Sequence, residues 1–117
     1  ANSIDYNEQS NYGIIVGGDF IKDSLNKNNC VLFYIDKIKN IHFYSPKIRP
    51  SGYKSCVKNI RGKVWISCGT TGVDITNDNG NNWHHFNNTS FNVMGVSKNK
   101  KQVYFAGKNG IVAKMDL

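Results

Sequence analysis

The 117-residue chain has a mass of 13.2 kDa, which allows one domain with a core but not two of ordinary size. Its 11 Gly, 2 Pro, 6 Tyr and 6 Phe favour short strands joined by tight turns, so we predict an all-β domain. The net charge of +7 comes largely from lysines scattered through turns, which is typical of a solvated surface, and nucleic-acid binding is not expected.

No stretch approaches the run of about 18 apolar residues that a membrane-spanning helix needs. The first residues, Ala1-Asn2-Ser3, also lack the basic and apolar regions of a signal peptide. We therefore expect neither a membrane span nor a leader in this chain.

Three segments along the chain share one pattern, an apolar strand that ends in glycine at Gly18, Gly69 and Gly107. Their spacing is close to the roughly 40–45 residues of a four-stranded propeller blade, with the first unit longer by about a dozen residues. The pattern therefore predicts a repeat of β-sheet units.

The strands of each unit follow from the register of these three segments and from the turns between them. The first unit has expected strands at 3–7, 12–17, 30–36 and 41–44, and a polar insertion at 20–29. The second has them at 55–60, 63–68, 73–76 and 83–86, and the third at 91–97, 102–106 and 111–115, without a fourth. We predict a single domain, 1–117: a partial β-propeller of about three four-stranded antiparallel blades (about 1–47, 48–89 and 90–117), the last lacking its outer strand.

The turn between the last two strands of the second unit carries a short motif. Asn79-Gly80 supplies the positive φ of a tight turn, Asp78 can accept hydrogen bonds from the turn's backbone, and Thr76 and Trp83 flank it. These residues match S/T-x-D-x-G-x-x-W and resemble the Asp-box (BNR) repeat of sialidase-type β-propellers. The resemblance implies that Thr76, Asp78, Gly80 and Trp83 are structural and lie away from the binding face.

Three further stretches, Gly13–Asp19, Gly52–Val57 and Ala106–Lys114, look like the closing blades of propellers related to photosystem II assembly and stability factors. This resemblance covers nearly the whole chain. It implies a non-catalytic scaffold for recognition or assembly, binding a protein or carbohydrate ligand, often outside the cytoplasm. The missing blades are expected from a longer parent chain or from a second copy, because an open arc exposes apolar end faces.

The face opposite the Asp box is the expected binding surface. Arg49 and Tyr53 are the strongest candidates, because a forked cation beside an aromatic ring suits a carboxylate, a sugar or a partner side chain. The alternative is that residues 49–52 form a long loop and Tyr53 packs at the start of a strand. The full candidate set is Asp19, Arg49, Tyr53, Lys54, Thr70, Thr71, Lys108 and Asn109.

The alternative function is a fragment of a sialidase- or xyloglucanase-like glycoside hydrolase whose catalytic residues lie mostly elsewhere. Glycosidases need two carboxyl groups, or a Tyr and Glu with an Arg cluster, but this chain has one Glu, Glu8, and two Arg. An Asp19–Asp74 pair is conceivable, although Asp74 within a strand is more consistent with a structural role. No catalytic residue is assigned.

Metal and cofactor sites are not expected. His84 and His85 point to opposite faces of a strand, and no metal-ligand cluster, dinucleotide fingerprint or G-x-S-x-G motif is present. Cys30, Cys56 and Cys68 form no CxxC motif. A hairpin turn at Arg61-Gly62 with Ile60 opposite Lys63 would place Cys56 opposite Ser67 and Ser55 opposite Cys68, so a disulfide is possible but not favoured.

Overall fold

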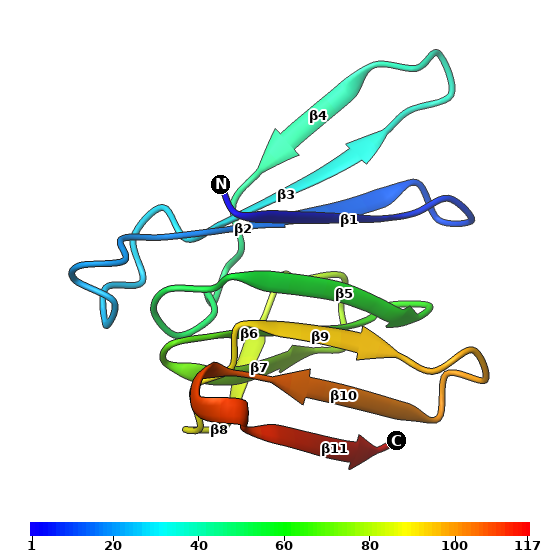
Figure 1. Cartoon of the computed structure of the whole chain (residues 1–117). Coiled ribbons are helices and arrows are strands. Elements are labelled where there is room, and N and C mark those ends of the chain that lie inside the picture. The colour runs from blue at the N-terminus through cyan, green and yellow to red at the C-terminus, as the bar shows by residue number, and fades with distance from the viewer.

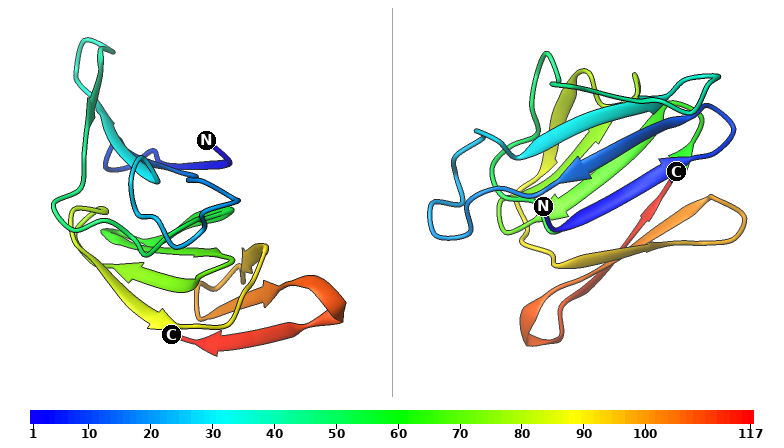
Figure 2. Two further views of the ribbon diagram at one scale, coloured as in Figure 1. Left: turned by 90° about the vertical axis from the view of Figure 1, so that its left-hand side faces the viewer. Right: turned by 90° about the horizontal axis from the view of Figure 1, so that it is seen from above.

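Three antiparallel β-sheets lie side by side in a fan in the computed structural model, which describes residues 1–117 (Figures 1 and 2). Within each sheet, strands that follow one another in the chain are neighbours. Sheet 1 contains β1 (Ser3–Asn7), β2 (Tyr12–Val16), β3 (Cys30–Ile35) and β4 (Ile41–Tyr44). Sheet 2 contains β5 (Cys56–Arg61), β6 (Val64–Gly69), β7 (Gly72–Thr76) and β8 (Trp83–Asn87), and sheet 3 contains β9 (Val93–Val96), β10 (Gln102–Ala106) and β11 (Val112–Asp116).

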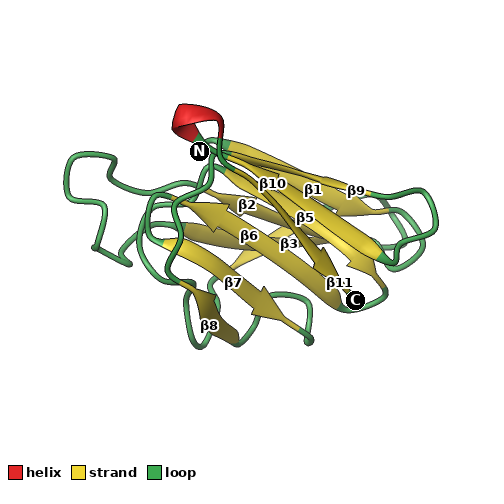
Figure 3. Cartoon of the chain, turned by 60° about the horizontal axis from the view of Figure 1, so that its bottom comes forward, coloured by secondary structure: helices red, strands yellow, loops and turns green.

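The all-β prediction is confirmed, as is the division into sheets of four, four and three antiparallel strands. Each predicted strand lies within two residues of an observed one at both ends. The only helical segment is a 3-10 turn, Lys108–Gly110, between β10 and β11, and strands dominate the view in Figure 3. No helix is long and apolar enough to cross a bilayer.

Two apolar cores hold the three sheets together. Each sheet turns an apolar row toward its neighbour, as in β3, where Leu32 is buried in the core and the adjacent Val31 is exposed on the other face. The core between sheets 1 and 2 includes Trp65 and Trp83. The larger core, between sheets 2 and 3, consists of Cys56, Ile60, Ile66, Cys68, Val73, Phe91, Met94, Val103 and Phe105.

The sheets converge at their first strands, because β1 lies beside β5 and β5 lies beside β9. Polar side chains on β1 reinforce this contact. The backbone N–H of Val57 donates to Ser3 Oγ over 3.1 Å, and that of Asn59 donates to Asp5 Oδ2 over 2.7 Å. From this line of inner strands, each sheet runs outward to its last strand, β4, β8 or β11 (Figure 2).

The expected register of the hairpin at Arg61-Gly62 is wrong by one residue. The strands pair Cys56 directly with Cys68, and the register shifts between Asn59 and Arg61. The cause is a β-bulge, in which one extra residue, Ile60, turns into the core between sheets 2 and 3. The two cysteines are therefore direct cross-strand neighbours, and all three cysteines are free thiols.

The turn from Thr76 to Trp83 is closed by its own side chains. Asp78 Oδ1 accepts hydrogen bonds from Thr76 Oγ1 at 2.8 Å and from the backbone N–H of Asn82 at 2.9 Å, and Thr76 Oγ1 accepts from the N–H of Gly80 at 3.1 Å. Gly80 has φ of 87°, and a Cβ atom there would lie 2.6 Å from the Leu32 side chain of sheet 1. Trp83 is buried in the core between sheets 1 and 2, so the turn fixes one end of that interface.

Candidate functional site

The end of the sheets opposite the Thr76–Trp83 turn is formed by loops that contact one another. Backbone hydrogen bonds join residues far apart in the chain: Lys54 N–H donates to Gly17 O over 2.8 Å, and Phe91 N–H donates to Gly69 O over 3.1 Å. We call this surface the loop face; it comprises residues 17–29, 49–55, 69–72, 87–92 and 107–111. The loops of all three sheets therefore form one continuous surface.

The long insertion after β2 is held at its base. Asn29 is fully buried, and its Nδ2 atom donates to Pro50 O at 2.7 Å and to Gly52 O at 2.8 Å. At the start of the insertion, Asp19 Oδ1 accepts hydrogen bonds from the N–H groups of Ile21 and Lys22, both over 3.0 Å. The insertion is thus an ordered loop fixed to the segment 45–55.

Several of the predicted binding residues are accessible on the loop face. Asp19 is exposed, and Tyr53 is half-buried with its ring 5.3 Å from that of Phe20, edge to face. Lys108 and Asn109 are exposed in the 3-10 turn. These residues come from sheets 1 and 3 and from the connection between sheets 1 and 2.

Arg49 is exposed but lies toward the outer flank. Its neighbour Ile48 bridges to Asn82 in the Thr76–Trp83 turn, whereas Pro50 on its other side accepts a hydrogen bond from Asn29. Arg49 therefore projects where segment 45–55 passes between the two ends of the molecule.

Lys54 lies beneath the loop face rather than on it. Its ammonium is 2.9 Å from Asp74 Oδ1, and the two side chains are only 0% and 2% exposed. Lys54 Nζ also donates to Thr71 Oγ1 at 3.1 Å and to Gly72 O at 3.3 Å. The neighbouring Thr70 has a buried Oγ1 without a hydrogen-bond partner. Lys54 and Thr71 thus act as internal supports of the face.

The ion pair keeps Asp74 in its charged form. Burial alone would raise the pKa of Asp74, but the charge and hydrogen bond of Lys54 and two hydrogen bonds from Ser51 outweigh it and lower this pKa. The Ser51 bonds are short: its N–H donates to Oδ2 and its hydroxyl donates to Oδ1, both over 2.7 Å. The general acid of a glycosidase needs a raised pKa, whereas the pKa of Asp74 is lowered, so Asp74 is not suited to that role.

Ser51, Asp74 and His85 meet at the outer side of sheet 2. His85 Nδ1 is 2.9 Å from Ser51 Oγ and 3.1 Å from Asp74 Oδ1, while its Nε2 is 2.7 Å from Asn88 Oδ1. The hydrogen bonds to Asn88 and Asp74 raise the pKa of His85.

This cluster lacks the geometry of a nucleophilic triad. A triad uses one histidine nitrogen for the serine and the other for the carboxylate, so that a proton can pass between them. In this protein the serine and the carboxylate share Nδ1, and Ser51 is bound directly to Asp74. The cluster instead ties segment 45–55 to β7 and β8.

This cluster was not predicted from the sequence, because Ser51, Asp74 and His85 lie 11 to 34 residues apart. Their approach depends on β7 pairing with β8 so that Asp74 lies opposite His85. The cluster could have been predicted only from the register in which β7 pairs with β8. Arg49 and Tyr53 were predicted from the sequence as residues of a long loop, and the structure places Arg49 exposed and Tyr53 half-buried in that loop.

No metal centre is apparent, and the thiol of Cys30 is not reactive. No group of three or more His, Cys, Asp or Glu side chains is arranged to hold a metal ion. Burial raises the pKa of Cys30 to about 12, so this thiol is protonated at neutral pH.

Comparison of the chain with protein-family models, with curated proteins and with solved structures finds no match.

Proposed function

We propose that this chain is part of an Asp-box β-propeller, similar to the photosystem II assembly-factor type, that serves as a non-catalytic scaffold for recognition or assembly. It binds a protein or carbohydrate partner through the loop face. The observation that carries this proposal is the continuous loop surface, with Asp19, Tyr53 and Lys108 accessible above the buried Lys54–Asp74 pair.

The buried pair makes the face suitable for recognition. Its hydrogen bonds fix segment 45–55 against sheet 2. The position of Tyr53 is therefore set in the free protein. Such preorganisation lowers the entropy cost of binding. Asp78 and Trp83 stabilise the opposite end and take no part in it.

The apolar outer faces of the end sheets support the propeller part of the proposal. On sheet 1, the register aligns Ile4, Ile15 and Val31 in one row and Phe33 beside Phe43 in the next, with Ile4 62% and Phe43 65% exposed. On sheet 3, Val93, Ala106 and Val112 share a row. Exposed apolar sheet faces of this kind are normally covered by another sheet. Additional blades, from a longer chain or from a second copy, would cover them.

The test is ligand selection on the loop face. The 117-residue protein is screened against a glycan array and a random-peptide phage library, and each ligand is retested on Arg49→Ala and Tyr53→Ala variants. Loss of a charge-assisted hydrogen bond, about 1.5–3 kcal/mol, predicts a roughly 10- to 150-fold loss of affinity for Arg49→Ala. The melting temperature of both variants should stay that of the wild type. Ligands that bind both variants as tightly as the wild type would contradict the assignment of this face.

A further inference from the structure

The aromatic side chains of sheet 1 nearest the Thr76–Trp83 turn form a row across three strands. The register pairs Tyr12 of β2 with Tyr34 of β3, and Tyr34 with His42 of β4. The ring centroids are 5.9 Å apart in the first pair and 4.6 Å apart in the second, whose rings stack at an interplanar angle of 10°. Tyr44 extends the row, with its ring 6.2 Å from that of Tyr34. We call these four residues the aromatic row.

The aromatic row faces sheet 2. Tyr12 and Tyr34 lie two residues from Ile14 and Leu32 on their strands, and side chains two positions apart in a strand share a face. Ile14 and Leu32 belong to the core between sheets 1 and 2, and Tyr44 packs against this core. The row therefore continues the core toward the turn, but with rings that carry polar groups and are partly exposed.

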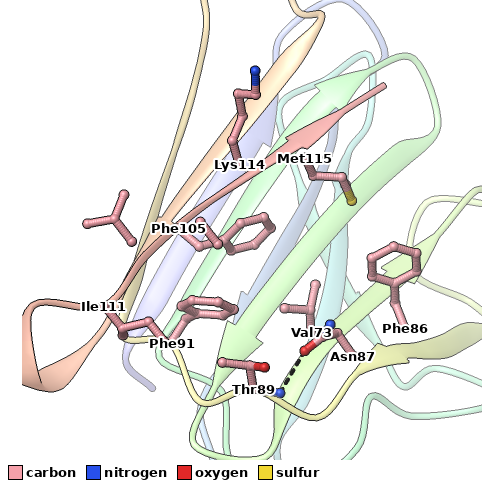
Figure 4. A pocket seen from close by; sticks show the side chains of 11 residues that line it. Val73, Phe86, Asn87, Thr89, Phe91, Phe105, Ile111, Lys114 and Met115 are labelled. Atoms are coloured by element: carbon pink, nitrogen blue, oxygen red, sulfur yellow. Dashed lines mark hydrogen bonds between the residues drawn. The ribbon is translucent and has the colours of Figure 1, made fainter.

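The corresponding position between sheets 2 and 3 is apolar. Val64 precedes Ile66 by two residues, as Tyr12 precedes Ile14, and Val64 packs against the core between sheets 2 and 3. The pocket between these two sheets is also lined mainly by apolar side chains, such as that of Met115 (Figure 4). Packing one sheet on the next thus does not require a tyrosine at this position.

A pocket of about 420 Å³ separates two tyrosines of the aromatic row from the turn of sheet 2. Its volume lies within the range of roughly 300–1,000 Å³ that is usual for small-molecule sites. One wall of the pocket is aromatic and the other is polar. We call it the tyrosine pocket; it is lined by Tyr12, Tyr44, Lys63, Asp78, Asn79 and Asn81.

The polar wall carries hydrogen-bond donors that the protein itself does not use. Asn79 Oδ1 accepts from Trp65 Nε1 at 3.1 Å, and Asn81 Oδ1 accepts from the backbone N–H of Lys47 at 3.2 Å. These bonds orient the two amides, and their Nδ2 groups donate to no other protein atom. The ammonium of Lys63 is likewise exposed and without a protein partner.

The tyrosine pocket suits a ring with an apolar face and oxygen acceptors around its edge. A pyranose sugar has this form, because its C–H face can pack on an aromatic ring while its hydroxyl oxygens accept hydrogen bonds. The charges of Lys63 and Asp78 offset each other, and Asp36 adds a carboxylate 2.8 Å from His42. A phosphate backbone needs a surplus of basic residues, so this balance favours a neutral sugar over nucleic acid.

We propose that the tyrosine pocket is a second binding site, which takes a neutral pyranose residue of a glycan. The sugar ring lies against Tyr12 and Tyr44. Its hydroxyl oxygens accept hydrogen bonds from the amides of Asn79 and Asn81 and from the ammonium of Lys63.

This site is independent of the proposed function and of what covers the end sheets. Additional blades would cover the outer face of sheet 1, which carries Ile4, Ile15 and Val31, whereas the aromatic row lies on the face toward sheet 2. The pocket also lies at the Thr76–Trp83 end of the molecule, opposite the loop face. It therefore stays open in a longer propeller.

Isothermal titration calorimetry of the 117-residue protein tests the site with maltohexaose, cellohexaose, chitohexaose and mannohexaose. These neutral glycans differ in linkage and in ring substituents. We expect saturable binding of at least one of them at millimolar concentration. A single-stranded oligothymidine is the polyanion for comparison, and it should bind more weakly than that glycan.

Two variants test the two walls of the pocket. Tyr12→Ala removes an aromatic ring and should weaken glycan binding at least about fivefold. Lys63→Ala removes a donor and should weaken it about threefold or more. The matched controls, Tyr104→Ala and Lys98→Ala, remove an exposed tyrosine and an exposed lysine of sheet 3 and should leave binding unchanged.

Circular dichroism melting confirms that each variant is folded. Lys63 is exposed and its side chain has no protein partner, so Lys63→Ala keeps the test decisive even where Tyr12→Ala does not fold.

The proposal is overturned if none of the four glycans binds saturably, or if Lys63→Ala binds the glycan as tightly as Lys98→Ala does. It is also overturned if oligothymidine binds more tightly than every glycan. Arg49→Ala should leave glycan binding at this pocket unchanged. A loss of glycan binding in Arg49→Ala but not in Lys63→Ala would place the sugar on the loop face and contradict this site alone.

Discussion

Replacing Asp74 by Asn should destabilise the fold strongly, because it leaves the buried ammonium of Lys54 without a counter-charge. Both side chains are almost fully buried, 0% and 2% exposed, and the ion pair spans 2.9 Å. Breaking one partner of such a pair costs about 3–5 kcal/mol. This is a large part of the roughly 5–15 kcal/mol that holds a domain folded.

Urea unfolding followed by tryptophan fluorescence measures the effect, because Trp65 and Trp83 both lie in the core between sheets 1 and 2. With an m value of about 2 kcal/mol/M, the midpoint should fall by about 2 M urea. The single variant Lys54→Met and the double variant complete the cycle. We expect a coupling energy of about 0.5–3 kcal/mol between the two positions, since the double variant no longer buries an unpaired charge.

The stabilisation that the Asp74 carboxylate gives the native state should decrease in acid. The native pKa of Asp74 lies below the unfolded value of about 3.9, so the carboxylate stabilises the native state fully above that value. This contribution is lost as the pH falls through the native pKa, and the stability gap between wild type and Asp74→Asn should narrow in acid. A gap below about 1 kcal/mol at neutral pH, or one that widens in acid, would refute the role given to this pair.

Three further predictions concern other parts of the fold. Asp78→Ala should cost about 1–3 kcal/mol in urea unfolding, because the N–H of Asn82 and the hydroxyl of Thr76 lose their acceptor, and should leave loop-face binding per folded molecule intact; a selective loss of binding with unchanged melting would contradict this. Gly80→Ala should destabilise by more than about 1 kcal/mol, since φ is 87° and the new methyl group would meet Leu32; a variant as stable as the wild type in the same assay would be evidence against this packing. Cys30 should resist a thiol reagent at pH 8 in the native state and react in urea, because burial raises its pKa to about 12; modification of native Cys30, located by peptide mapping, would show that the site opens.

The strands and their grouping could be read from the sequence because local signals agree there. A short, continuous apolar run such as Cys30–Ile35, bounded by turn-forming residues, marks a strand, and glycines at the strand ends mark the turns. The three strands of sheet 3 were likewise predictable from the repeat pattern. These features depend on neighbours in sequence, and local patterns record them well.

The candidate site depends on contacts between residues far apart in the chain, and local sequence patterns do not predict such contacts. A lysine in a loop is normally solvated, so Lys54 was expected on the surface; its burial requires Asp74, which reaches it only when segment 45–55 folds over β7. The bulge at Ile60 was missed for a similar reason. The Ile60 side chain is buried in the core between sheets 2 and 3, and this burial shifts the register of the hairpin by one residue. The apolar pocket between sheets 2 and 3, lined by Phe86 and Met115 among others, also exists only once the two sheets are placed against each other.

The central claim, that this chain is an arc of a β-propeller whose end faces need covering, is tested most directly by its association state. Multi-angle light scattering over a range of concentrations should show association of the 117-residue protein, and Phe43→Lys on the outer face of sheet 1 should reduce it without lowering the melting temperature. A stable, cooperatively melting monomer at every concentration would contradict the claim.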